Sequence, residues 1–315
     1  MANFVKISTL SWTGDHYETD KAVLRKRTIA DLKRDLAAIE GCGVDMVLTS
    51  ECVGYFAWIK DETESLEKPG ELLTIYTDFA RRNHCVVVGS IFLRENGAVH
   101  NSLLFVNVDG TILGVYHKNF LTFGPRSEID FGVTPGSEIF LAKTPFGTIG
   151  GAICFDLNFA DLRARYKQAK PDILCFASMY HGGLMQGIWA YDLRAFFVAA
   201  LYFPNEPFGI LDPFGRPVKF TSSYEPWIIQ RVNLDRVMMH LTWNDIKFLE
   251  IRKKYGEEVV IDVPPSIGSA LLYSNSPNRT ALDIAKEFDL VLLDDFFAMA
   301  VEENGKRRKL KTRAP

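Results

Sequence analysis

The sequence predicts an α/β protein in which helices cover sheets that contain both parallel and antiparallel strands. Its 315 residues are 47% hydrophobic and 24% charged, which is enough apolar material for a large buried core. Two observations carry the prediction. Strands that are apolar throughout, with no alternation of apolar and polar residues, follow amphipathic helices. This pattern is typical of a sheet whose faces are covered by helices. Turn signals such as Asp109-Gly110 then join further strands directly, which predicts antiparallel hairpins.

The first ninety residues read as strand, helix, strand, helix, strand. Residues 5–10 are strand-like, 21–40 form a charged helical stretch, and 46–48 are a short apolar strand. Apolar residues recur at helical spacing over 71–83, and 85–91 is a continuous β-branched run. This alternation favours parallel strands connected by helices.

The middle of the chain has the character of hairpins. Residues 103–108 and 111–115 flank Asp109-Gly110, and 139–143 and 148–154 flank a second turn. We therefore expect antiparallel pairs here.

The α/β pattern then resumes without a linker. Residues 160–169 and 184–195 are compatible with helices, and 172–177 and 197–202 with strands. A further helical stretch covers 243–255.

A composition shift near residue 260 predicts a domain 1–260 and a C-terminal extension 261–315. The extension contains a helical stretch 281–288 and an apolar 290–293, so we expect it to be folded to about residue 303. Lys306 to Arg313 carries six basic residues and no acid, which predicts a solvated, frayed tail.

Charge and motif content exclude several classes of protein. Lys plus Arg is 36 and Asp plus Glu is 39, so a net charge of −3 gives no general attraction to nucleic acid or anionic membrane. The longest apolar run, 195–203, is too short for a bilayer, and residues 1–12 do not resemble a signal peptide. Five cysteines without a close pair favour a reducing cytosol over disulfides or zinc, and the scattered histidines indicate no metal. A small molecule is the expected partner.

Cys154 is the residue whose setting suggests chemistry. It follows a strand that contains Gly150-Gly151 and precedes a predicted helix. Such junctions in α/β enzymes project a nucleophile into space that backbone N–H groups also face.

Several motifs together resemble the carbon–nitrogen hydrolase family, also called the nitrilase superfamily. They are the segments 100–104, 109–110, 114–118 and 151–159, and the resemblance covers about residues 3–235. It implies a four-layer αββα sandwich, with two sheets face to face and helices outside, and a homodimer or higher homo-oligomer. The chemistry that it implies needs no cofactor.

The resemblance implies a catalytic set of Glu51, Lys118 and Cys154. Glu51 stands at a strand end, although Ser50 replaces the proline that commonly precedes it. Glu51 would act as the base, and Lys118 with the backbone N–H of Phe155 would stabilise an oxyanion. Members also carry a second glutamate, for which Glu128 is the best candidate and Asp130 the next.

Two segments depart from the family pattern, and the substrate pocket is less defined. Asn158 to Asp161 replaces the common Arg-Phe-Pro-Glu, and Phe196-Phe197 replaces a usual acidic position. Aromatic and imidazole side chains near the predicted strand ends are substrate-binding candidates, each of which is also a plausible packing residue. They are Tyr55, Phe56, Trp58, Tyr180, His181 and Trp189.

The leading hypothesis is a cytoplasmic hydrolase of linear amides or N-carbamoyl compounds that acts through a thioester. Nitrile hydrolysis and acyl transfer by the same residues remain open. A non-catalytic binding or scaffold protein is the alternative from another class, because of the changed segments.

Overall fold

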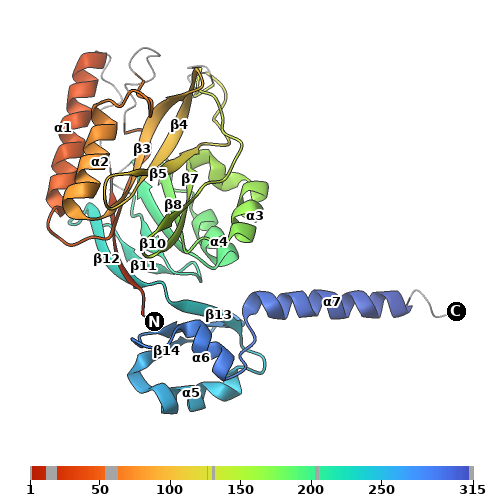
Figure 1. The fold of residues 1–315 in the computed structure, drawn as a ribbon. Coiled ribbons are helices and arrows are strands. Elements are labelled where there is room, and N and C mark those ends of the chain that lie inside the picture. The colour runs from red at the N-terminus through yellow and green to blue at the C-terminus, as the bar shows by residue number, and fades with distance from the viewer. Residues whose placement is uncertain are drawn as a thin grey trace. The chain divides into compact units, whose positions relative to one another are not determined.

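The computed structural model describes residues 2–11, 20–53, 63–125, 127–129, 132–202 and 206–311. The chain divides into two units (Figure 1). The larger unit is Val5–Arg231, and the smaller combines Met1–Phe4 with Val232–Pro315.

The larger unit contains two six-stranded sheets. The first has the order β12-β1-β2-β3-β4-β5, and the second β11-β10-β9-β8-β7-β6. The first comprises β12 (Trp227–Asn233), β1 (Phe4–Leu10), β2 (Met46–Thr49), β3 (Val86–Glu95), β4 (Ala98–Val106) and β5 (Ile112–His117). The second comprises β11 (Pro217–Phe220), β10 (Gly209–Leu211), β9 (Phe196–Leu201), β8 (Ile173–Ser178), β7 (Gly147–Ile153) and β6 (Leu141–Thr144).

Parallel and antiparallel pairing follow the connections between the strands. β1, β2 and β3 are parallel, as are β7, β8 and β9, and helical crossovers lie between most of them. β4 and β5 are antiparallel around the turn at Asp109-Gly110, and β6 and β7 form a second hairpin. Both hairpin predictions are confirmed.

Helices cover the two sheets on their outer faces (Figure 1). α1 (Lys21–Ile39) packs on α2 (Glu71–Asn83), which contacts β3 and β4. α3 (Ala160–Ala169) packs on α4 (Leu184–Leu193), which contacts β9 and β10. The inner faces meet where β2 contacts β8 and β9 and where β4 contacts β7. The expected four-layer sandwich is confirmed.

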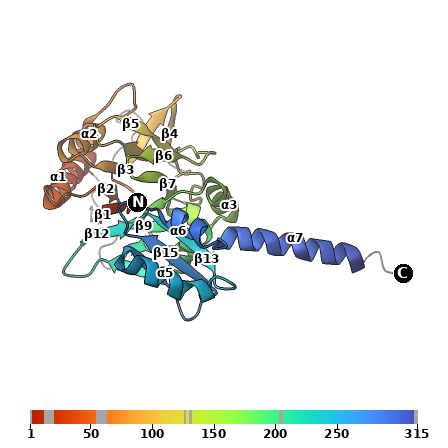
Figure 2. The ribbon, with the colours of Figure 1, turned by 60° about the horizontal axis from the view of Figure 1, so that its bottom comes forward.

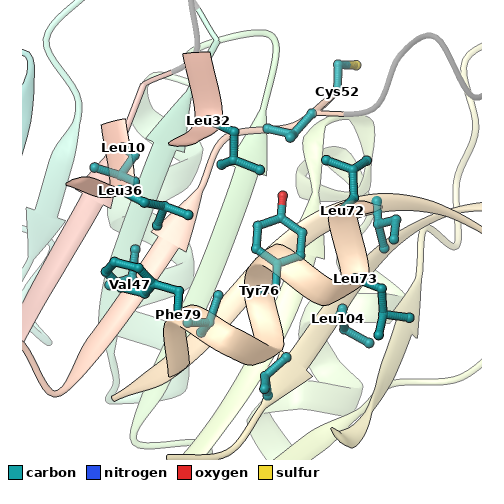
Figure 3. Close-up of a cluster of buried hydrophobic side chains, with 14 of the residues drawn as sticks. Leu10, Leu32, Leu36, Val47, Cys52, Leu72, Leu73, Tyr76, Phe79 and Leu104 are labelled. Carbon is teal, nitrogen blue, oxygen red and sulfur yellow. The ribbon is translucent and has the colours of Figure 1, made fainter. Parts of the chain in front are cut away.

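The helix layer is fixed to the first sheet by buried apolar side chains. Figure 3 shows Leu32 and Leu36 of α1 gathered with Tyr76 of α2 and Val47 of β2. Tyr76 is fully buried and lies directly on Gly89, where a Cβ atom would stand 2.5 Å from the Tyr76 ring. Glycine is therefore required at this position of β3, since a larger residue would push α2 off the sheet.

The smaller unit is built on an antiparallel sheet of order β13-β15-β14 (Figure 2). Its strands are β13 (Arg236–His240), β14 (Val259–Asp262) and β15 (Ser269–Ser274), and its helices include α5 (Phe248–Tyr255), α6 (Ala281–Glu287) and α7 (Leu293–Lys311). The N–H of Ala2 donates to Ser276 O at 2.8 Å, and the N–H of Leu234 donates to Asn3 O at 2.7 Å.

The division between the units differs from the boundary that the composition suggested. It falls at Val232 rather than near residue 260, because β13 pairs with β15 along five residues and so joins 236–240 to the C-terminal strands. The expected frayed tail is likewise helical up to Lys311. Ion pairs one turn apart, Glu302–Lys306 at 2.6 Å and Glu303–Arg307 at 2.9 Å, support that helix.

A buried carboxylate holds the first turn of α2. Glu64 accepts hydrogen bonds from the backbone N–H groups of Gly70 at 3.1 Å, Leu72 at 2.9 Å and Leu73 at 2.9 Å. These are N–H groups that a helix start leaves without intrahelical partners, and a carboxylate also matches the positive end of the helix dipole.

We expect Glu64→Ala to lower the free energy of unfolding by about 2–4 kcal/mol, because buried N–H donors lose a charged acceptor. Urea denaturation followed by circular dichroism measures this. The control is Glu71→Ala, which removes an exposed ion pair with Lys33 at 2.9 Å and should cost less than about 1 kcal/mol. Equal effects of the two substitutions would contradict the role given to Glu64.

Candidate active site

Cys154 stands where β7 ends and a 3₁₀ turn, Cys154–Asn158, begins. Its φ is +48°, a left-handed conformation that residues other than glycine adopt rarely and at a cost. Ile153 before it is still extended, so the chain turns sharply at the cysteine. The strained turn lifts the thiol out of the strand.

Asp156 joins this turn to the loop that follows β5. Its Oδ2 accepts from the N–H of Ile153 at 2.9 Å and the hydroxyl of Tyr116 at 2.7 Å. Its Oδ1 accepts from the N–H groups of Asn119 at 3.1 Å and Phe120 at 2.8 Å. Full burial raises the pKa of Asp156 to about 6, although these donors oppose the rise.

Lys118 lies between two carboxylates. Its Nζ is 3.0 Å from Glu51 Oε1 and 2.9 Å from Glu128 Oε2. The side chains of Lys118, Glu51 and Glu128 are only 1%, 2% and 7% exposed. Glu51 follows β2 and Lys118 follows β5, so two strands of the first sheet supply them, with β3 and β4 between these strands. The structure thus brings three of the sequence-predicted residues together.

Further groups hold the two carboxylates in place. The side-chain amide of Asn101 donates to Glu51 Oε1 at 2.9 Å and to Glu128 Oε1 at 2.8 Å. The N–H of Met179 donates to Glu51 Oε2 at 2.8 Å. Thr122 donates its N–H at 2.9 Å and its hydroxyl at 3.0 Å to Glu128 Oε2.

The cluster favours charged side chains despite its burial. Burial alone would lower the pKa of Lys118, but the carboxylates of Glu51 and Glu128 hold that pKa well above its usual value. Burial would raise the pKa of Glu128, but Lys118 and the amide of Asn101 keep it below its usual value. Lys118 is therefore a permanent ammonium.

The Cys154 thiol is neutral in this setting. Burial first, and then the carboxylate of Glu51, raise its pKa to about 12, and Lys118, Ser178 and the N–H of Met179 only partly oppose them. Because the thiolate is the nucleophile, the proton must leave as sulfur attacks. The Glu51 carboxylate is close enough to the thiol to raise its pKa.

Tyr180 and Trp189 have different surroundings. Burial and then Cys154 raise the pKa of Tyr180 to about 12, which places its ring near the thiol, and its hydroxyl accepts from Asn158 Nδ2 at 3.2 Å. Trp189 is fully buried in α4 and donates its indole N–H to Leu157 O at 3.0 Å. It supports the turn that carries Cys154 instead of facing a substrate pocket.

His181 uses one ring nitrogen within its own loop and the other on the segment before β10. Nδ1 accepts from the N–H of Gly183 at 3.1 Å, and Nε2 is 2.9 Å from Pro207 O. An N–H donor on one side and a carbonyl on the other assign the neutral tautomer with hydrogen on Nε2. These hydrogen bonds give His181 a structural role, and its contact with a substrate stays a prediction.

Phe155 belongs to an aromatic group beside the nucleophile. Phe120 stacks on Phe159 with ring centroids 3.6 Å apart, and Phe155 meets Phe159 edge to face at 5.3 Å. The N–H of Phe155 lies in the first turn of the 3₁₀ segment, where helix geometry leaves N–H groups without intrahelical partners. Its part in an oxyanion site stays a prediction. Tyr55, Phe56, Trp58 and Asp130 lie outside the described residues.

Sequence reasoning gave no role to Asn101, Asp156 or Met179. Asn101 lies in the His100-Asn101-Ser102 motif, and Asp156 lies two residues after the nucleophile. Their polar side chains inside recognised motifs were the signal that could have marked them as site residues. Met179 contributes a backbone N–H, for which no side-chain signal exists.

The described residues also bear on metal binding and on membrane spanning. Across the described ranges, no group of three or more His, Cys, Asp or Glu side chains is arranged to hold a metal ion. None of the helices in those ranges combines the length and apolar character that a membrane span requires.

Comparison with known proteins identifies the family. The sequence model of the family described as carbon-nitrogen hydrolase matches residues 12–229. The chain belongs to the carbon-nitrogen hydrolase family, and the resemblance on which the site residues were chosen is confirmed at this level.

Two of the relatives that the chain matches are named as amidases. The chain is 28% identical over 185 residues to deaminated glutathione amidase of Mus musculus, covering 54% of this chain and 56% of that protein. It is 36% identical over 87 residues to N-carbamoylputrescine amidase of Oryza sativa subsp. japonica, covering 27% of this chain and 29% of that protein. The match thus spans about half the length of the first of these relatives, and less of the second.

A solved structure shares the fold. A variant of the amidase from Nesterenkonia sp. AN1, with the acetamide moiety of fluoroacetamide added covalently at its active-site cysteine, matches with a TM-score of 0.60. The identity is 14%, over 73% of this chain and 90% of that one.

We expect no thiolate absorbance from Cys154 below about pH 10, because its pKa of about 12 keeps the thiol neutral. The ultraviolet difference spectrum between the wild-type protein and Cys154→Ala, followed through a pH titration, isolates this cysteine from the other four. A thiolate signal at neutral pH would show that the thiol is ionised before any substrate arrives.

Proposed function

We propose that the protein hydrolyses a linear amide or N-carbamoyl compound with Cys154 as nucleophile, Glu51 as base and Lys118 as an electrostatic catalyst. The observation that carries this proposal is the buried Lys118 ammonium between Glu51 and Glu128, beside a thiol that is neutral at rest. Removing an ammonium and two carboxylates from water is costly even when they are paired, so their joint burial argues for use in a reaction.

In the first half of the reaction, Glu51 removes the proton of Cys154 while sulfur bonds to the carbonyl carbon. The carbonyl oxygen becomes an oxyanion. An ammonium has three N–H donors, and Glu51 and Glu128 engage two of those on Lys118. The third, together with the N–H of Phe155, would stabilise the oxyanion.

In the second half, the C–N bond breaks and the leaving nitrogen takes the proton from Glu51. The acyl group stays on Cys154 as a thioester. Glu51 then removes a proton from water, whose oxygen attacks the thioester carbon, and the returning proton restores the thiol. The balance is one amide and one water converted to one carboxylic acid and ammonia or an amine.

The relatives support this reading without fixing the substrate. The names of the two relatives are those of amidases, one of them for an N-carbamoyl compound. The Nesterenkonia amidase forms a covalent adduct at its cysteine. The same three residues would serve nitrile hydrolysis or acyl transfer to an amine, and a non-catalytic scaffold is the remaining alternative.

Trapping the acyl group on Cys154 tests the proposal. We expect intact-mass and peptide mass spectrometry, after mixing with aliphatic amides, N-carbamoyl amines and nitriles, to show one acyl group on the Cys154 peptide for at least one compound. Ammonia release should accompany it. Cys154→Ala should give neither signal. Cys52→Ala should keep both, because it removes a different buried thiol, whose sulfur contacts Met179.

The adduct also separates the alternatives. Its mass names the acyl group, and transfer of that group to an added amine would reveal an acyltransferase. Absence of any adduct and of ammonia release across the whole set would overturn the catalytic proposal in favour of a scaffold.

We expect Glu51→Gln to slow acylation of Cys154 by about 10²- to 10⁴-fold, because the neutral thiol loses its base. Stopped-flow or quenched-flow measurement of adduct formation checks this. A loss below tenfold would place the base elsewhere.

A further inference from the structure

Asn101 occupies a position from which one side chain reaches both carboxylates. It lies in β4 with 1% of its surface exposed, and its backbone C=O accepts from the N–H of Lys118 at 2.8 Å. The two residues are therefore cross-strand neighbours at the end of one hairpin. The hydrogen bond between them keeps the Asn101 side chain in register with Lys118, and a shift between β4 and β5 would break it.

The amide group is shared equally between the two glutamates. Nδ2 carries two N–H bonds, and its contacts are Glu51 Oε1 at 2.9 Å and Glu128 Oε1 at 2.8 Å. Because both neighbours are acceptors, the orientation of the amide is fixed. Oδ1 is buried without a hydrogen-bond partner among the described residues. This orientation directs both N–H donors of Asn101 at the two carboxylates.

We propose that Asn101 is a positioning residue that holds Glu51 and Glu128 in their ionised forms around Lys118. This rests on the proposed function, in which Glu51 must be ionised to act as the base. Two carboxylates close together disfavour each other's charge, and one ammonium compensates only one of them. The two N–H groups of Asn101 favour the charged form of both.

Without these donors, the pair would take up a proton at higher pH. A proton bound within the pair weakens the base, because both carboxylates share the donors of Asn101 and Lys118. Among the described residues, the charged and titratable groups that face the pair are Lys118 after β5, Cys52 after β2, Cys154 after β7 and Tyr180 after β8.

The pH dependence of Cys154 alkylation by iodoacetamide tests the role without a substrate. In the wild type, we expect the rate to rise with pH as the glutamate pair ionises. Asn101→Leu keeps the size of the side chain and removes both donors. The low-pH part of the profile, in which the rate rises (the acid limb), should therefore move to higher pH by about one unit or more. The rate on that limb should fall about tenfold at a fixed pH. Glu51→Gln should abolish the limb, which identifies its origin.

Asn244→Leu is the matched control. Asn244 is also fully buried and also donates both amide N–H groups, to His240 O at 2.7 Å and Val291 O at 2.8 Å, but it lies in the smaller unit. It should lower stability and leave the acid limb unmoved. Where Asn101→Leu does not fold, Asn101→Ser replaces it and should also shift the limb.

The outcomes separate this inference from the proposed function. A folded Asn101 variant with an unmoved acid limb overturns the positioning role, even if its turnover falls. A shifted acid limb supports the positioning role. It does so even if no amide acylates Cys154, and in that case only the proposed function fails. With an active substrate, the acid limb of kcat/KM should shift by the same amount.

Discussion

The burial of the Lys118 ammonium is the constraint on which the site depends. A charge removed from water is stable only when opposite charges and hydrogen bonds surround it, and Glu51 and Glu128 are within 3.0 Å. These carboxylates in turn need donors, which Asn101 and the N–H of Met179 supply. The first sheet provides Glu51, Asn101 and Lys118, and the second provides Cys154 and Met179. Face-to-face packing of the sheets is therefore a requirement of the chemistry.

Local patterns predicted the elements whose formation depends on nearby residues. The helix over Glu71–Asn83 was correct to the residue, since its apolar spacing and the first-turn and last-turn charges are all local. The Asp109-Gly110 turn located a hairpin for the same reason. The division at Val232 was missed because the pairing of β13 with β15 joins residues about thirty or more positions apart. The helical end of α7 was missed because the basic run from Lys306 was judged without Glu302 and Glu303, which lie one turn before it.

The site shows the same limit. Glu51, Lys118 and Cys154 follow strand ends inside motifs, so the resemblance was sufficient to select them, and Glu128 was a weaker choice within a loop. The contacts that define their chemistry are long-range. Met179 reaches Glu51 across 128 positions, through a backbone group that any residue would carry. Such contacts emerge only when the two sheets are placed together.

The composition of the two units has a consequence for biosynthesis. Ala2 and Asn3 are made early but bond to Ser276 and Leu234, so the smaller unit cannot close until the last quarter of the chain has left the ribosome. The sandwich Val5–Arg231 contains both sheets and every proposed catalytic residue, and domains generally fold as units during synthesis. A nascent chain can therefore assemble the proposed catalytic residues before Ala2 and Asn3 meet their hydrogen-bond partners.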